Sequence, residues 1–200
     1  NIDNVKLAIE KMERDQKVIN VSTTGEPASG YVVGNIDPSQ NVVRYSGPES
    51  LIEQIDHIDA VININGYSSD INTTADLKIY DAANNEIKSN SIKLNITTVD
   101  VAVSILATKI VPLSYVVPDE PAAGYVVNGD MISVPETIVI AGRSSVLDGV
   151  SRIVVSDPAL TVEDLTESKT TIVNIRKYLP TGVQFADSSF NGNVSVTIGI

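Results

Sequence analysis

Glu26-Pro27-Ala28-Ser29-Gly30-Tyr31-Val32-Val33 returns later in the chain as Glu120-Pro121-Ala122-Ala123-Gly124-Tyr125-Val126-Val127, with one substitution in eight positions. The offset between the two blocks is 94 residues. Two further markers stay in register with this repeat: Gly47 corresponds to Gly142, and the alternating run 99–105 corresponds to 194–200. Because the markers keep their spacing over a whole copy, they indicate an internal duplication. The sequence therefore predicts two tandem copies of one domain.

The composition favours β-structure. The chain has 200 residues, with 27 Val, 24 Ile and 14 Thr against 10 Leu. Residues branched at Cβ lose side-chain freedom in helices and pack well on pleated sheets. Apolar residues make up 42% of the chain and aromatic residues 4%, so a core of small branched aliphatic side chains is expected. We predict a mostly β fold.

The repeat offset sets the predicted domain borders. The first copy is expected at residues 1–106 and the second at 107–200. Residues 4–9 alternate polar and apolar side chains like the closing strand of a copy, so we expect them to end a preceding copy. A short helix over 9–16 is the competing prediction, because that run is rich in helix-forming residues.

Each copy is expected to follow the same order of elements. The Gly-Tyr-Val-Val block forms a strand, followed by a turn at 34–38 in the first copy and at 128–130 in the second. After the next strand comes a short helix, which Gly47 can cap and in whose first turn Pro48 fits. The second copy has Gly142 and Arg143 at these places, and Gly149 is expected to shorten its helix.

The repeated block allows two interpretations. Exposed Tyr31 and Tyr125 could bind a ligand, or Gly30 and Gly124 could meet a backbone requirement while the following residues pack in a strand. We favour the structural interpretation, because no chemical partner accompanies the block in both copies. The hallmark positions are therefore read as structural: Gly30, Tyr31, Gly47, Pro48, Gly124, Tyr125 and Gly142.

Charge and residue types exclude several classes of function. The formal net charge is −11, which opposes binding to nucleic acid or to anionic membranes. The chain has no Cys and a single His, so thiol catalysis, disulfides and zinc sites built from Cys or paired His are excluded. No phosphate-binding loop or nucleophile elbow is present.

Three acidic clusters remain as candidates for chemistry. Residues 56–59 (Asp-His-Ile-Asp) could hold a general base, but a solvated helix exit is the favoured interpretation. Asp81, Asn84, Asn85 and Glu86 offer oxygen ligands for calcium, although an ordinary hairpin turn is favoured. The third cluster, Glu163, Asp164 and Glu167, is expected to be a solvated helix turn or loop. We predict no catalytic residues, no metal and no cofactor.

These motifs together resemble the YbbR-like domain family. The resemblance lies in the order of Glu26–Val33, the segment from Gly47 to Ile52 with Ile55 and Ile58 behind it, and the alternating strand 99–105 followed by Lys109. The second copy repeats the order and departs from it at Arg143. The resemblance implies β-rich domains, each with a short helix, similar to the C-terminal domain of long L25-type ribosomal proteins.

The resemblance also implies a function. Such proteins resemble extracytoplasmic regulators of a membrane-bound diadenylate cyclase, the enzyme that makes cyclic di-AMP, and they have no catalytic residues of their own. A transmembrane anchor upstream of residue 1 is therefore expected, with this segment outside the cytoplasm. The expected partners are the cyclase and neighbouring copies in the same chain. No nucleic acid is expected, and this segment is not expected to insert into the membrane.

Other functions remain open at this point. Tandem β domains of this size also suit a structural spacer or an adhesin-type surface protein. The helix segment within each copy argues against immunoglobulin-like sandwiches, which need no such element. An RNA-binding role would rest on fold analogy alone, and the charge of −11 opposes it.

Overall fold

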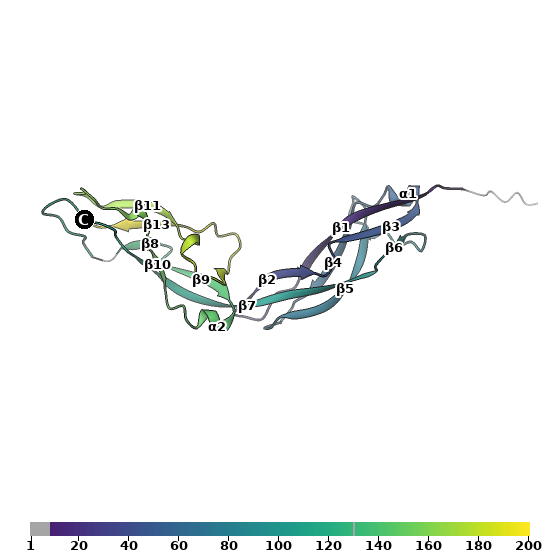
Figure 1. Ribbon diagram of the computed structural model, residues 1–200, viewed down its shortest axis with the longest axis horizontal. Helices are drawn as coiled ribbons and strands as arrows, with labels where there is room; N and C mark the ends of the chain where they lie inside the picture. The colour runs from purple at the N-terminus through teal and green to yellow at the C-terminus, as the bar shows by residue number, and fades with distance from the viewer. Residues whose placement is uncertain (1–8, 130) are drawn as a thin grey trace, which may run out of the picture. The chain divides into compact units, whose positions relative to one another are not determined.

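The computed structural model describes residues 9–129 and 131–200. Strands dominate the chain, and the described residues contain two α-helices of four residues each (Figure 1). The predicted mostly β fold is confirmed. The chain divides into two compact units. Unit one holds the residues before 29 and residues 33–105, and unit two holds residues 29–32 and 106–200. Independent folding of 1–106 and 107–200 stays a prediction.

Unit one is built on a long first strand that belongs to two ladders. Its elements are β1 (Met12–Thr24), β2 (Tyr31–Pro38), β3 (Val42–Pro48), α1 (Glu49–Ile52), β4 (His57–Asn63), β5 (Ile71–Tyr80), β6 (Lys93–Leu94) and the first part of β7 (Thr98–Tyr115). Residues 12–18 of β1 pair antiparallel with β3, whose other edge pairs with β6. From Ile19 onward β1 pairs in parallel with β4. β5 then joins β4 to β7.

Unit two repeats the first part of this pairing pattern. Its elements are the last part of β7, β8 (Ile132–Val134), β9 (Thr137–Gly142), α2 (Ser144–Leu147), β10 (Ile153–Val155), β11 (Lys169–Asn174), β12 (Val183–Phe185) and β13 (Asn193–Ile198), with short 3₁₀ turns at Pro158–Leu160 and Arg176–Tyr178. Residues 107–112 pair antiparallel with β9. From Leu113 onward β7 pairs in parallel with β10. β12 covers the other edge of β9, as β6 covers that of β3. The strands β8, β11 and β13 form a separate three-stranded sheet.

The cores follow the same repeat. Ile58 pairs with Ile19 in unit one, and Ile153 pairs with Leu113 in unit two. Both isoleucines are almost completely excluded from solvent, at 0% and 1% exposure. The other buried side chains are mostly Val and Ile, because strands that alternate inward and outward positions bury every second residue.

Residues 9–11 lie in no helix or strand and β1 begins at Met12, so the competing helix over 9–16 is wrong. From Met12 the chain pairs residue by residue with β3, and this ladder prevails over local helix propensity. The predicted strand over 4–9 falls outside the described residues except for Ile9, which is exposed and in no element.

The repeated block has different structures in the two copies. In the first copy Tyr31–Pro38 is a strand, so the turn predicted at 34–38 is wrong; β2 pairs with β7 over this length. Gly30 has φ +83°, and its carbonyl accepts hydrogen bonds from the Thr108 amide and hydroxyl. The strand predicted over 124–127 is also wrong. There the described chain has no ladder partner, although Gly124 keeps a positive φ of +90°.

Both helices form, and their capping differs from the prediction. The N-cap residues are Pro48 and Arg143, not Gly47 and Gly142, and neither caps through its side chain. Gly47 and Gly142, which precede them, instead allow a neighbouring backbone segment to pack closely. A Cβ on Gly142 would lie 2.9 Å from the Gly182 carbonyl, and one on Gly47 would lie 3.1 Å from the Ser91 carbonyl. None of the helices in the described chain is long and apolar enough to span a membrane.

Candidate functional site

The acidic cluster around His57 is part of a cross-strand contact. His57–Asp59 begin β4, so the predicted helix exit is wrong for these residues. Nδ1 of His57 lies 2.8 Å from Asp56 Oδ2, and Nε2 lies 3.7 Å from Asp59 Oδ2. The imidazole stacks on Tyr80, the residue opposite it on β5, with 5.2 Å between ring centroids. The ring is thus held at the edge of the unit-one core, where it fastens β4 to β5.

The second cluster is a turn that uses its own oxygens. Oδ1 of Asp81 accepts hydrogen bonds from the amides of Ala83 and Asn85, and the Asn85 side chain also donates to this carboxylate. These bonds, the Asn85 amide first, hold the pKa of Asp81 below its ordinary value. Asn84 has φ +62°, a conformation that Asn tolerates in turns. Within residues 9–129 and 131–200 no group of three acidic or His side chains is arranged to hold a metal.

The third cluster, Glu163, Asp164 and Glu167, lies in an exposed loop with a positive φ of +56° at Asp164. A nearby carboxylate that does form hydrogen bonds is that of Asp119, which was not among the residues predicted from the sequence. It accepts hydrogen bonds from the Thr161 hydroxyl and, at 2.6 Å, from the Val162 amide. These bonds, the hydroxyl first, lower the pKa of Asp119. Glu163, Asp164 and Glu167 therefore do not form a site.

Stability should depend on pH through such carboxylates. The Lys177 ammonium, 2.8 Å away, is the main cause that lowers the pKa of Asp157. A carboxylate whose pKa is lower in the folded state stabilises the fold above its unfolded pKa of about 3.9, and this contribution is lost as pH falls through the folded value. We therefore expect the free energy of unfolding to be level above about pH 5 and to fall below about pH 4.

Urea unfolding over this pH range measures the effect. Asp157→Asn should reduce the fall in the free energy of unfolding at acid pH. Glu53→Gln, at an exposed residue next to α1, should leave this fall unchanged. If the free energy of unfolding falls equally steeply at acid pH in wild type and Asp157→Asn, Asp157 does not contribute to the pH dependence.

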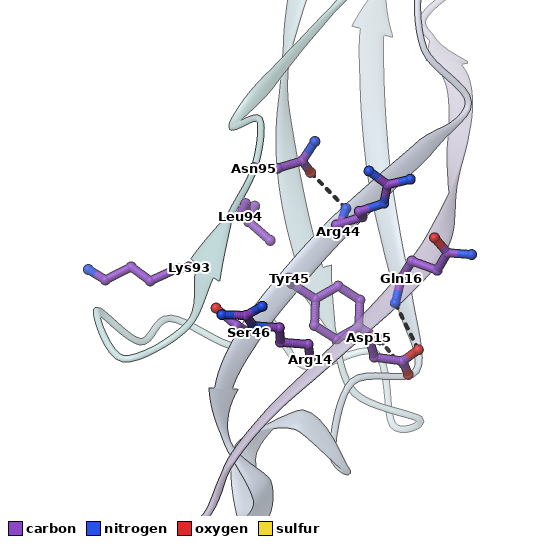
Figure 2. Close-up of a pocket in the computed structure, with 9 residues that line it drawn as sticks. All are labelled: Arg14, Asp15, Gln16, Arg44, Tyr45, Ser46, Lys93, Leu94 and Asn95. Carbon is purple, nitrogen blue, oxygen red and sulfur yellow. Dashed lines mark hydrogen bonds between the residues drawn. The ribbon is translucent and has the colours of Figure 1, made fainter.

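A groove within unit one lies on the outer face of β1, β3 and β6 (Figure 2). Its volume is about 570 Å³. Strand register arranges its lining in two rows: Arg14, Ser46 and Lys93 lie opposite one another, and so do Gln16 and Arg44. Asn95 completes the second row, since its amide and side-chain oxygen both bond to the Arg44 backbone, at 2.9 and 2.7 Å. We call these six residues the cationic face.

A buried tyrosine supports the cationic face from below. Tyr45 is 3% exposed, and its hydroxyl donates to Asp15 Oδ2 at 3.3 Å. Burial and then the Asp15 charge raise the pKa of Tyr45 to about 12, so the hydroxyl stays protonated at neutral pH. Asp15 also accepts a hydrogen bond from the Gln16 amide. The one carboxylate in the groove lining is therefore already occupied.

The three cations of this face have no anionic partner among the residues that the structure describes. Over the described ranges, Arg14, Arg44 and Lys93 take part in no ion pair and no side-chain hydrogen bond. Figure 2 shows the Lys93 side chain extended away from the sheet. Unpartnered positive charge is unusual in a chain with 25 acidic and 14 basic residues. Sequence reasoning missed this face, whose signal was the alternation of Arg14 with Gln16 and of Arg44 with Ser46.

Unit two has the same strand register without the charges, although Ala141, in the place of Ser46, is completely buried there. Its rows are Thr108, Ala141 and Gln184, then Ile110, Val139 and Ala186. The Ala186 amide donates to the Val139 carbonyl at 3.0 Å, the bond that Asn95 forms with Arg44. Since the same strand pairing forms in both units, the fold does not require cations at the positions of Arg14, Arg44 and Lys93.

Comparison with known proteins finds a family to which part of the chain is similar. Residues 17–105 match the family model described as YbbR-like protein. A solved structure of a YbbR-like protein from Streptococcus pneumoniae TIGR4 aligns over 98% of each chain, at 12% sequence identity and a TM-score of 0.41. No curated protein matches the sequence. Residues 17–105 of this chain are similar in sequence to the YbbR-like family.

Proposed function

We propose that this chain is a non-enzymatic part of a membrane-anchored protein. It lies outside the cytoplasm and regulates a membrane-bound diadenylate cyclase through protein–protein contact. The observation that carries the proposal is the similarity of residues 17–105 to the YbbR-like family. The resemblance of its sequence motifs to regulators of such cyclases supplies the partner and the location.

The state of the polar clusters supports a role without chemistry. The carboxylates of Asp81, Asp119 and Asp157 accept hydrogen bonds from neighbouring amides and hydroxyls of their own loops. His57 is stacked on Tyr80 and held by adjacent acidic side chains. Groups used in this way hold turns and strands together, and catalysis needs groups that are positioned toward a substrate.

The repeated pairing pattern supports a second copy in residues 107–200. Glu13 lies opposite Gly47 in unit one, and Ala107 lies opposite Gly142 in unit two. Both first strands then change to a parallel partner, at Ile19 and at Leu113. We infer that the chain is a tandem array of YbbR-like domains.

A co-expression experiment tests the proposal. The membrane protein that contains this chain is expressed with the cyclase, with and without residues 1–200, and cellular cyclic di-AMP is measured. Deletion should change the nucleotide level, and the intact protein should co-purify with the cyclase. Unchanged cyclic di-AMP together with no association would overturn the regulatory role and favour a structural spacer.

A further inference from the structure

We propose that the cationic face of unit one binds a short acidic segment of a partner protein, one that carries two or three carboxylates. This inference rests on the proposed contact function, although it does not depend on which protein is the partner. The face is the outer surface of β1, β3 and β6 formed by Arg14, Gln16, Arg44, Ser46, Lys93 and Asn95.

The hydrogen-bonding groups of the face suit an oxyanion. Arg14 and Arg44 carry guanidinium groups, which bind carboxylates in a bidentate manner, and Lys93 adds an ammonium group. Asn95 uses its side-chain oxygen for the Arg44 amide. Its side-chain NH₂ is therefore the end that faces a ligand. The carboxylate of Asp15 is engaged by the Tyr45 hydroxyl and the Gln16 amide, so it leaves the cations unpartnered.

The spacing of the cations favours an extended ligand over a single ion. Neighbouring strands lie about 4.8 Å apart, and alternate residues on one strand lie about 6.8 Å apart. Arg14 and Lys93 are separated by two strand spacings, with Ser46 between them. Arg44 lies one strand and two residues away from each of them, so the Cα positions of the three cations are about 8–10 Å apart. Alternate residues of an extended peptide are about 6.8 Å apart, and the long Arg and Lys side chains can span the difference. Carboxylates at alternate positions can thus meet two or three cations, whereas one small ion cannot.

The surroundings of the face limit the length of the ligand. Residues 1–106 contain 15 acidic and 8 basic residues, a net charge of −7. Charges interact over a Debye length of about 8 Å at physiological salt. A long polyanion, such as a nucleic acid or an anionic membrane, would extend beyond the face and be repelled by the net negative charge of the unit. The carboxylates of a short acidic segment can all lie next to the three cations.

Unit two supplies the substitutions for the test. Thr108, Val139 and Gln184 occupy the places of Arg14, Arg44 and Lys93 in the same pairing pattern. The triple variant Arg14→Thr, Arg44→Val, Lys93→Gln therefore removes the charges with residues that this architecture already accommodates. Arg152→Gln, at an exposed residue of unit two, is the matched control that removes a cation elsewhere.

The experiment is an NMR titration of the ¹⁵N-labelled chain with a blocked peptide, acetyl-Gly-Asp-Ser-Asp-Ser-Asp-Gly-amide, at low salt. Amide shifts should be concentrated on β1, β3 and β6. Affinity should fall at least about tenfold in the triple variant, since each exposed charge pair contributes up to about 1 kcal/mol, and stay unchanged in Arg152→Gln. The same peptide with Asn in place of Asp should not bind, and added salt should weaken binding.

Three results would overturn the proposal. The first is no shift on these strands with the acidic peptide. The second is equal binding by the triple variant, whose fold is checked by circular dichroism and thermal melting. The third is binding of inorganic phosphate, or of vesicles containing phosphatidylglycerol, at the face as tight as that of the peptide. None of these measurements involves the cyclase, so their failure is separate from failure of the cyclic di-AMP test.

Discussion

Ile58→Ala will lower the free energy of unfolding of unit one by about 2–5 kcal/mol, and Ile153→Ala will do the same for unit two. Both side chains lie at the centre of a core, with 0% and 1% exposure. Each sits on the strand that pairs in parallel with the first strand of its unit. Truncation to Ala removes apolar contacts and leaves a cavity that the surrounding strands cannot fill.

Hydrogen exchange followed by mass spectrometry locates the effect. Ile58→Ala should speed exchange in β1 and β3–β5, and Ile153→Ala should speed it in β9–β13. Val61→Ala, at an exposed position on β4, is the control and should change little. If either core variant accelerates exchange equally in both units, the chain unfolds as one body and the predicted domains 1–106 and 107–200 are wrong.

Gly142→Ala will destabilise unit two by about 1–3 kcal/mol, the usual cost of overpacking a tight site. The new Cβ would lie 2.9 Å from the Gly182 carbonyl and 3.3 Å from a methyl group of Leu147. The carbonyl belongs to the backbone that leads into β12, so it cannot move without disturbing the pairing of β12 with β9.

Gly149→Ala is the matched control. Its Cβ would lie 3.6 Å from the Val146 carbonyl, an ordinary contact, and its φ is not positive. Urea unfolding of the two variants should separate them by more than about 1 kcal/mol. Equal stability of Gly142→Ala and wild type would show that this hallmark glycine is not needed for close packing.

Patterns that depend on strand alternation were predictable from sequence. The run Val99–Ile105 alternates buried and outward residues, and it lies in β7 as expected. The corresponding run 194–200 lies largely in β13, which ends at Ile198. In these segments the period of two is set by burial on one face, which local sequence reports directly.

Structure that depends on a distant partner was not predictable in the same way. Nearly identical octapeptides form the start of a strand after Gly30 and an irregular segment after Gly124. The difference lies in the partner: Thr108 binds Gly30, and no strand within the described chain pairs with residues 124–127. Local sequence cannot report which strand edge is available.

The candidate site illustrates the same limit. Arg14, Arg44 and Lys93 are far apart in the sequence, and only the register of three strands brings them onto one face. The net charge of −11 gives no sign of a local excess of positive charge. The acidic clusters could be recognised because their residues are contiguous in the sequence. In the structure their side chains hold a turn and the start of a strand.

The most direct test of the proposed function is the initial rate of cyclic di-AMP synthesis by the purified cyclase in lipid vesicles. The anchored protein that contains this chain is reconstituted with it at increasing ratios, and a version lacking residues 1–200 serves as the control. We predict that the rate changes saturably with the intact protein and stays constant with the deletion. A rate that is the same for both proteins at every ratio would contradict regulation by these domains.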